Sequence, residues 1–236
     1  MASKPTTTTT TKPKTQNPLT RLYLTLYNAL SLALWATCTA QGLALLATAT
    51  PLPHIFNHVF PLLLATQSLA LLEILHSVVG LVRAPIFTTA MQVASRILLV
   101  WGIMYLFREG GVVGGDGVVV GGIEEKAKTG DYGFLGCLVA WGVTECIRYG
   151  FFALQVSGWG VPGWWAWLRY NTFYVLYPLG ITSECVMVVM ALGPAAEWMP
   201  VYRWFLVAVL GIYVPGSYIL YTHMIAQRRK ALKKKD

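Results

Sequence analysis

The chain has 236 residues, of which 56% are hydrophobic and only 12% are charged, and its formal net charge is +8. Soluble domains carry about 25% charged residues, so this composition excludes an ordinary soluble globular domain and indicates a membrane protein. The four cysteines lie in hydrophobic stretches without CxxC pairing. This pattern favours small buried residues over disulfides or metal ligands.

The first 20 residues are polar, basic and low in complexity, which predicts a disordered tail over residues 1–20. Six hydrophobic runs follow, each long enough to cross about 30 Å of hydrocarbon as a helix. In chain order they are Leu22–Leu46, Ile55–Val79, Ile86–Phe107, Phe134–Val156, Trp164–Leu192 and Val201–Ile225. The sequence therefore predicts an all-α polytopic membrane protein, a six-transmembrane-helix bundle over residues 21–226, followed by a basic tail at 227–236.

Lysines and arginines collect before the first run and after the last. The positive-inside rule then predicts that both termini are cytosolic, which an even number of spans allows. Residues 108–133 would form a lumenal, glycine-rich loop, and they lack the G-K-[ST] of a phosphate-binding loop, so a flexible insertion is favoured. The terminal "KKKD" resembles a dilysine signal, which predicts the endoplasmic reticulum membrane as the location.

Ionisable side chains inside the runs are unusual, because each costs at least about 2.5–3.5 kcal/mol near the centre of a bilayer. Three acids and three arginines occur there: Glu73, Arg96, Glu145, Arg148, Arg169 and Glu184. The equal numbers predict pairing inside the bundle. For any one of these residues, a structural pair and a chemical role are equally good interpretations.

The spacing of these residues predicts a blind pocket that opens to the cytosol. Tyr177 is placed near the middle of the fifth run and Glu184 deepest; seven residues apart, they share a helix face about 10 Å apart along the axis. Pro178 predicts a kink that brings them closer. A second polar face carries Glu145, Arg148 and Tyr149. At this point an enzyme, a transporter and a scaffold all remain open.

Two ordered motifs, "TECIRY" (144–149) and "LRYNTFYVLYPLGITSE" (168–184), extend the analysis. With matching stretches over nearly all of the chain, they resemble the 3-hydroxyacyl-CoA dehydratases of very-long-chain fatty-acid elongation, once called protein-tyrosine-phosphatase-like proteins. The resemblance implies a six-span enzyme with Tyr177 and Glu184 as its catalytic pair. It also implies substrate-binding or supporting positions at Glu73, Arg83, Gln92, Arg96, Glu145, Arg148, Tyr149, Arg169 and Gly180. No cysteine has an arginine six positions later, so the phosphatase loop is missing.

The implied reaction converts (3R)-3-hydroxyacyl-CoA to trans-2-enoyl-CoA and requires no metal or redox cofactor. Glu184 is most simply the base for the Cα proton and Tyr177 the acid for the departing hydroxyl, although the reverse assignment stays open. The enolate charge would meet an arginine or a backbone N–H freed near Pro178. The CoA phosphates would lie near Arg83 and neighbouring arginines.

The expected partners are the 3-hydroxyacyl-CoA substrate, membrane lipid and, at family level, the condensing enzyme and reductases of the elongation cycle; nucleic acid is not expected. Two alternatives remain. A non-catalytic scaffold of the elongation complex would not need Tyr177 and Glu184 for its cellular role. A small-molecule transporter would need polar residues spread through both halves of the membrane, which the runs do not show.

Overall fold

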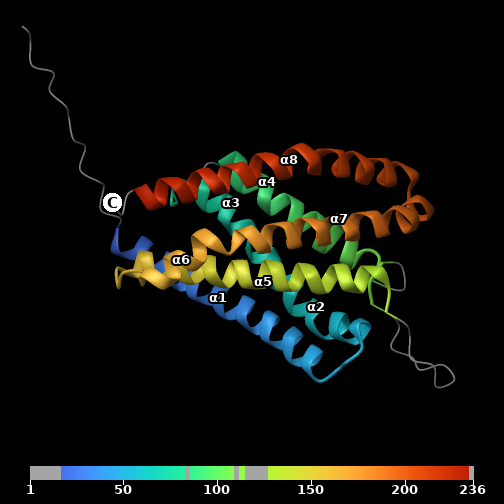
Figure 1. Cartoon of the computed structure of the whole chain (residues 1–236), viewed down its shortest axis with the longest axis horizontal. Coiled ribbons are helices and arrows are strands. Elements are labelled where there is room, and N and C mark those ends of the chain that lie inside the picture. The colour runs from blue at the N-terminus through green and yellow to red at the C-terminus, as the bar shows by residue number, and fades with distance from the viewer. Residues whose placement is uncertain (1–16, 83–85, 109–111, 115–126, 234–236) are drawn as a thin grey trace, which may run out of the picture.

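The computed structural model describes residues 17–82, 86–108, 112–114 and 127–233. Within these ranges every regular element is a helix (Figure 1). The elements are α1 (Pro18–Ala47), α2 (Leu52–Leu69), α3 (Leu71–Val78), α4 (Ile86–Ile97), the π-helix η1 (Leu98–Tyr105), α5 (Thr129–Ser157), α6 (Gly163–Asn171), α7 (Phe173–Trp198) and α8 (Pro200–Lys233). Most of the predicted tail 1–20 and of the predicted loop 108–133 falls outside the described residues.

The predicted class, an all-α polytopic membrane protein, is confirmed. Among the described residues, five helical stretches are long and apolar enough to cross a membrane: Pro18–Ala47, Leu52–Val78, Thr129–Ser157, Phe173–Trp198 and Pro200–Ala231. The remaining predicted span, Ile86–Phe107, which is third in chain order, differs from these because α4 runs directly into η1 instead of continuing as one α-helix. π-helical turns are rare and concentrate at functional sites.

The predicted fifth run was wrong in two respects, its continuity and its C-terminal end. The predicted fifth run, Trp164–Leu192, is divided at Thr172 into α6 and α7, and α7 continues to Trp198. The Thr172 hydroxyl donates to the Leu168 carbonyl at 2.9 Å, a local bond of the kind that bends helices. Pro178 lies within the continuous α7, so the break precedes it. Tyr177 is therefore in the second turn of α7.

The outer helices also extend beyond the predicted runs. α1 begins at Pro18, where the Asn17 side chain accepts a hydrogen bond from the Leu19 N–H at 3.1 Å, a favourable cap followed by proline at the first helical position. α8 continues to Lys233, so residues 227–233 are helical rather than part of a tail. The first residues of α1 and the last of α8 lie at the same end of the bundle, which we call the terminal end (Figure 1).

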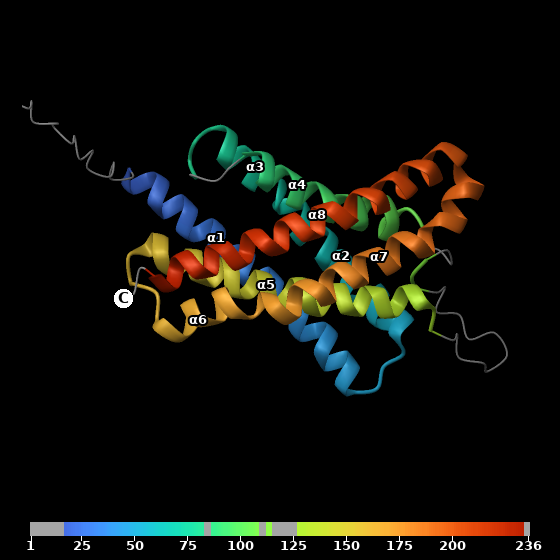
Figure 2. The same ribbon diagram turned by 45° about the horizontal axis from the view of Figure 1, so that its top comes forward.

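α5 is the central helix of the bundle. It lies between α1 and α7 in Figure 1, and α8 packs on the far side of α7. In the turned view of Figure 2, α8 crosses in front of α1. Glycines permit this close approach: an added Cβ at Gly142 would clash with Thr39 of α1, and one at Gly136 would clash with Ser183 of α7. Small residues at such contacts let transmembrane helices approach closely. The α5–α7 contact fixes the depth of Ser183 and of its neighbour Glu184.

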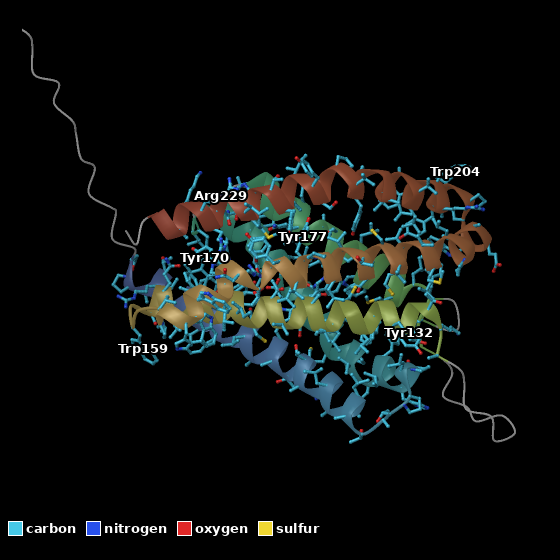
Figure 3. All side chains as sticks on the ribbon, in the orientation of Figure 1. Tyr132, Trp159, Tyr170, Tyr177, Trp204 and Arg229 are labelled. Atoms are coloured by element: carbon cyan, nitrogen blue, oxygen red, sulfur yellow. The ribbon has the colours of Figure 1, made fainter. Side chains whose placement is uncertain are left out.

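Exposed tryptophans mark the two ends of the bundle. Trp159 is 86% exposed at the terminal end, and Trp204 is 68% exposed at the opposite end (Figure 3). Tryptophan is enriched where a membrane meets water at both interfaces. This arrangement fits a bundle whose long axis crosses a bilayer, with Tyr177 between the two ends (Figure 3).

Candidate active site

Glu184 is a buried carboxylate with a separate hydrogen-bond donor for each oxygen. The indole N–H of Trp141, on α5, donates to Oε1 at 2.9 Å, and the hydroxyl of Tyr213, on α8, donates to Oε2 at 2.8 Å. Burial without hydrogen bonds would strongly disfavour a charged carboxylate. The two donors offset part of that cost and fix the orientation of the carboxylate.

Tyr177 points in the same direction as Glu184, towards α8. Its hydroxyl donates to the Ser217 carbonyl at 3.1 Å, and its ring stacks on Tyr221 with centroids 5.8 Å apart. The partners of Glu184 and Tyr177 on α8 are therefore Tyr213 and Ser217, one helical turn apart. The predicted common face of Tyr177 and Glu184 is present in the structure, with each side chain bonded to α8.

The predicted pairing of acids and arginines joins α3, α4 and α5. Arg148 donates to both oxygens of Glu73, at 2.7 and 2.6 Å, and through Nε to Glu145 at 2.7 Å. Arg96 donates to the other oxygen of Glu145, and the Tyr149 hydroxyl donates to Glu73. We call these five residues the charge network. Its two acids and two arginines compensate each other, so structural pairing accounts for all four charges.

Arg96 connects the charge network to Glu184. Its guanidinium carbon lies 5.9 Å from the centre of the Trp141 ring, within the range of a cation–π contact. Trp141 in turn donates to Glu184. Because Trp141 and Glu145 are four residues apart on α5, one face of this helix holds both the network and the donor to Glu184.

Arg169 lies apart from that network. Its guanidinium carbon lies over Phe151 and Phe152, 4.6 and 4.5 Å from the ring centres. In the part of the chain that the structure describes, Arg169 forms no ion pair with a carboxylate. The prediction that all three acids pair with all three arginines is therefore wrong for Glu184 and Arg169.

The remaining predicted positions are scattered. Gln92 is exposed on α4, one turn before Arg96. Gly180 is buried, and an added Cβ would lie 3.5 Å from that of Ala140, so Gly180 belongs to the α5–α7 contact. Arg83 lies outside the described residues.

The backbone N–H that was expected near Pro178 as a donor to the enolate does not arise there. Proline lacks an N–H, so Pro178 instead leaves a carbonyl of the preceding turn without its helical donor.

Sequence reasoning missed the contributions of Trp141 and of α8. Two signals were available. Trp141 lies one turn before the glutamate of "TECIRY", and Tyr213, Ser217 and Tyr221 recur every four residues within an apolar run. Polar side chains with that period occupy one helix face. Without a structure, nothing indicated that this face meets Tyr177 and Glu184.

Comparisons with known proteins agree with this site. The family model described as "Protein tyrosine phosphatase-like protein, PTPLA" matches residues 67–234, which include every helix that supplies a residue to the site. The chain belongs to this family. The match therefore covers the α7 motif, the charge network and the α8 residues together.

Curated PTPLA relatives are similar over most of their length. The "Probable very-long-chain (3R)-3-hydroxyacyl-CoA dehydratase" of Schizosaccharomyces pombe is 36% identical, with 90% of this chain and 93% of the relative covered. PASTICCINO 2 of Arabidopsis thaliana is 35% identical, covering 91% and 94%, and hpo-8 of Caenorhabditis elegans is 35% identical, covering 89% and 94%; both carry the same dehydratase name. The predicted family resemblance is confirmed. No solved structure matches the chain.

Proposed function

We propose that this PTPLA protein removes water from (3R)-3-hydroxyacyl-CoA to give trans-2-enoyl-CoA during very-long-chain fatty-acid elongation, with Tyr177 and Glu184 as its proton-transfer pair. Membership of the family makes the chain a hydro-lyase. The observation that carries the proposal is the common orientation of the two side chains: Glu184, buried and held by two donors, and Tyr177 both face α8 from α7.

Glu184 is the base in this proposal. Both of its partners donate hydrogen bonds, and donated bonds stabilise the ionised carboxylate that accepts the Cα proton. Tyr177 is the acid, because its hydroxyl carries a proton that the Ser217 carbonyl only holds in place. As the C3–O bond breaks, that proton passes to the departing hydroxide. Each transfer is typically worth about 10²–10⁴-fold in rate.

Arg96 is the proposed stabiliser of the enolate that forms on the thioester oxygen. A guanidinium has five N–H donors, and the bond to Glu145 uses a single nitrogen of Arg96. Its position over the Trp141 ring places this charge beside the residue that holds the base. A fixed positive charge in a water-poor site is an effective way to lower the energy of a developing oxyanion.

Arg169 and Arg228 are the proposed contacts for the CoA phosphates. Among the described residues, Arg169 has aromatic neighbours instead of a carboxylate. Arg228, on α8, donates at 3.0 Å to Asn171, which follows Arg169 by two residues on α6. Guanidinium groups suit bidentate phosphate contacts. In this proposal the terminal end faces the cytosol from the endoplasmic reticulum membrane. The acyl chain lies among apolar helix faces. The protein works beside the condensing enzyme and reductases of the elongation cycle.

The test is turnover of 3-hydroxyacyl-CoA by the purified full chain. Tyr177→Phe and Glu184→Gln should each lower kcat at least about 100-fold, because each removes one proton-transfer group. Tyr218→Phe and Glu197→Gln, at exposed positions on α8 and α7, serve as matched controls and should stay near wild type. Full activity of either site variant would refute the catalytic pair. If Glu184→Gln is inactive in vitro but still restores growth to a strain that lacks this protein, the scaffold alternative is favoured.

A further inference from the structure

Tyr213 is the α8 residue in direct contact with the proposed base. It lies half-buried in the middle of the helix, and its hydroxyl donates to Oε2 of Glu184 at 2.8 Å. α8 packs mainly against α7, so this bond joins the two helices at the level of Glu184. Neither family motif in the sequence includes Tyr213.

The two donors to Glu184 are chemically different. An indole nitrogen can only donate, whereas a phenol hydroxyl can donate to a carboxylate or accept from a carboxylic acid. When Glu184 takes up a proton, the bond to Tyr213 can therefore reverse, while the bond to Trp141 cannot. Oε2, on the Tyr213 side, is the oxygen that can carry the proton and keep its partner.

We infer that Tyr213 is a positioning residue of the dehydration: it orients Glu184 in both protonation states and makes Oε2 the oxygen that accepts the substrate proton. This inference rests on the proposed function. A misplaced base slows proton abstraction from bound substrate but leaves the contacts to CoA and to the acyl chain in place. The expected signature is a loss in kcat with little change in KM.

A purely structural role is the competing explanation, because the same bond holds α7 and α8 together. The chain supplies a matched control on the same helix. The Tyr202 hydroxyl, also half-buried, donates to the Gly102 carbonyl of η1 at 2.9 Å, away from Glu184. Tyr202→Phe therefore removes an equivalent interhelical hydrogen bond without touching the site.

The experiment measures kcat, KM and melting temperature for the full chain in lipid nanodiscs, as wild type, Tyr213→Phe and Tyr202→Phe. Tyr213→Phe should lower kcat about 10–100-fold, as expected for a lost hydrogen bond to a charged group, with KM within about twofold. Tyr202→Phe should keep the wild-type kcat, although both variants should melt at a lower temperature than wild type because each loses an interhelical hydrogen bond.

A second readout separates positioning from packing. The acid limb of the pH profile of kcat should move to higher pH in Tyr213→Phe only. The bond that Tyr213 donates to the charged carboxylate is stronger than the one it accepts from the neutral acid, so its loss favours the protonated form of Glu184. Equal kcat losses in the two variants, or an unchanged kcat in Tyr213→Phe, would overturn the inference. The proposed function would still stand in that case, provided that the wild type is active. An inactive wild type would overturn both.

Discussion

Trp141 and Glu184 lie on neighbouring helices, and the indole N–H of the first points at Oε1 of the second, 2.9 Å away. Both side chains are more than nine-tenths buried. Since an indole nitrogen cannot accept a hydrogen bond, it fixes Oε1 as an acceptor. The orientation of the proposed base is thus set from α5, the central helix, as well as from α8.

Trp141→Phe tests this contact. The substitution keeps an aromatic ring but removes the donor, so kcat should fall about tenfold or more, the usual effect of losing a hydrogen bond to a charged group. Trp101→Phe is the control, because its indole donates to Ser68 at an exposed site at 3.1 Å. Steady-state kinetics on both variants would check the prediction, and equal activities would count against it.

Arg169 should act on the CoA end of the substrate only. Arg169→Met is expected to raise KM for 3-hydroxyacyl-CoA about tenfold, because one charge-assisted phosphate contact is lost. The same variant should handle a 3-hydroxyacyl pantetheine thioester, which lacks the nucleotide phosphates, as wild type does. Comparison of KM for the two thioesters is the measurement. A parallel rise for both would place Arg169 elsewhere in the mechanism.

Arg148 should matter chiefly for stability. It bonds to Glu73 and Glu145, so Arg148→Met leaves two carboxylates without their shared partner. Breaking a buried pair costs about 3–5 kcal/mol; the lower end applies because the Arg148 side chain is 26% exposed. The melting temperature in detergent should therefore drop clearly, whereas Arg203→Met, at an exposed α8 position, should change it little. Similar melting temperatures would refute a structural network.

The contact between α5 and α7 can be tested at Gly136. A side chain there would meet Ser183, whose Cβ would lie 3.1 Å from the added Cβ, so Gly136→Val should push the helices apart. Such overpacking costs about 1–3 kcal/mol and should lengthen the Trp141–Glu184 contact, lowering both melting temperature and kcat. Gly211→Val has open space around it and is the control. Adding Ser183→Ala to Gly136→Val should restore part of the stability.

The sequence predicted the helical class and the location of most spans because long apolar runs have few alternatives in a bilayer. It also predicted pairing for Glu73, Glu145, Arg96 and Arg148, since unpaired charges inside a bundle are costly. The break at Thr172 was missed because it is a local change in backbone hydrogen bonding inside a continuous apolar run, and hydropathy does not mark it. Tyr213 and Trp141 were missed because tyrosine and tryptophan in an apolar run are usually interfacial or core residues, and only helix packing distinguishes those that face Glu184.

α8 supplies a direct partner to both Tyr177 and Glu184, yet only 6% of its most apolar window is buried within the protein, against 44% for α5. Most of this helix therefore faces away from the rest of the bundle, towards the lipid that would surround a membrane span. We therefore expect turnover to depend on bilayer thickness and acyl composition. Extraction into a short-chain detergent should diminish activity before it melts the remaining helices, and reconstitution into a matching bilayer should recover it.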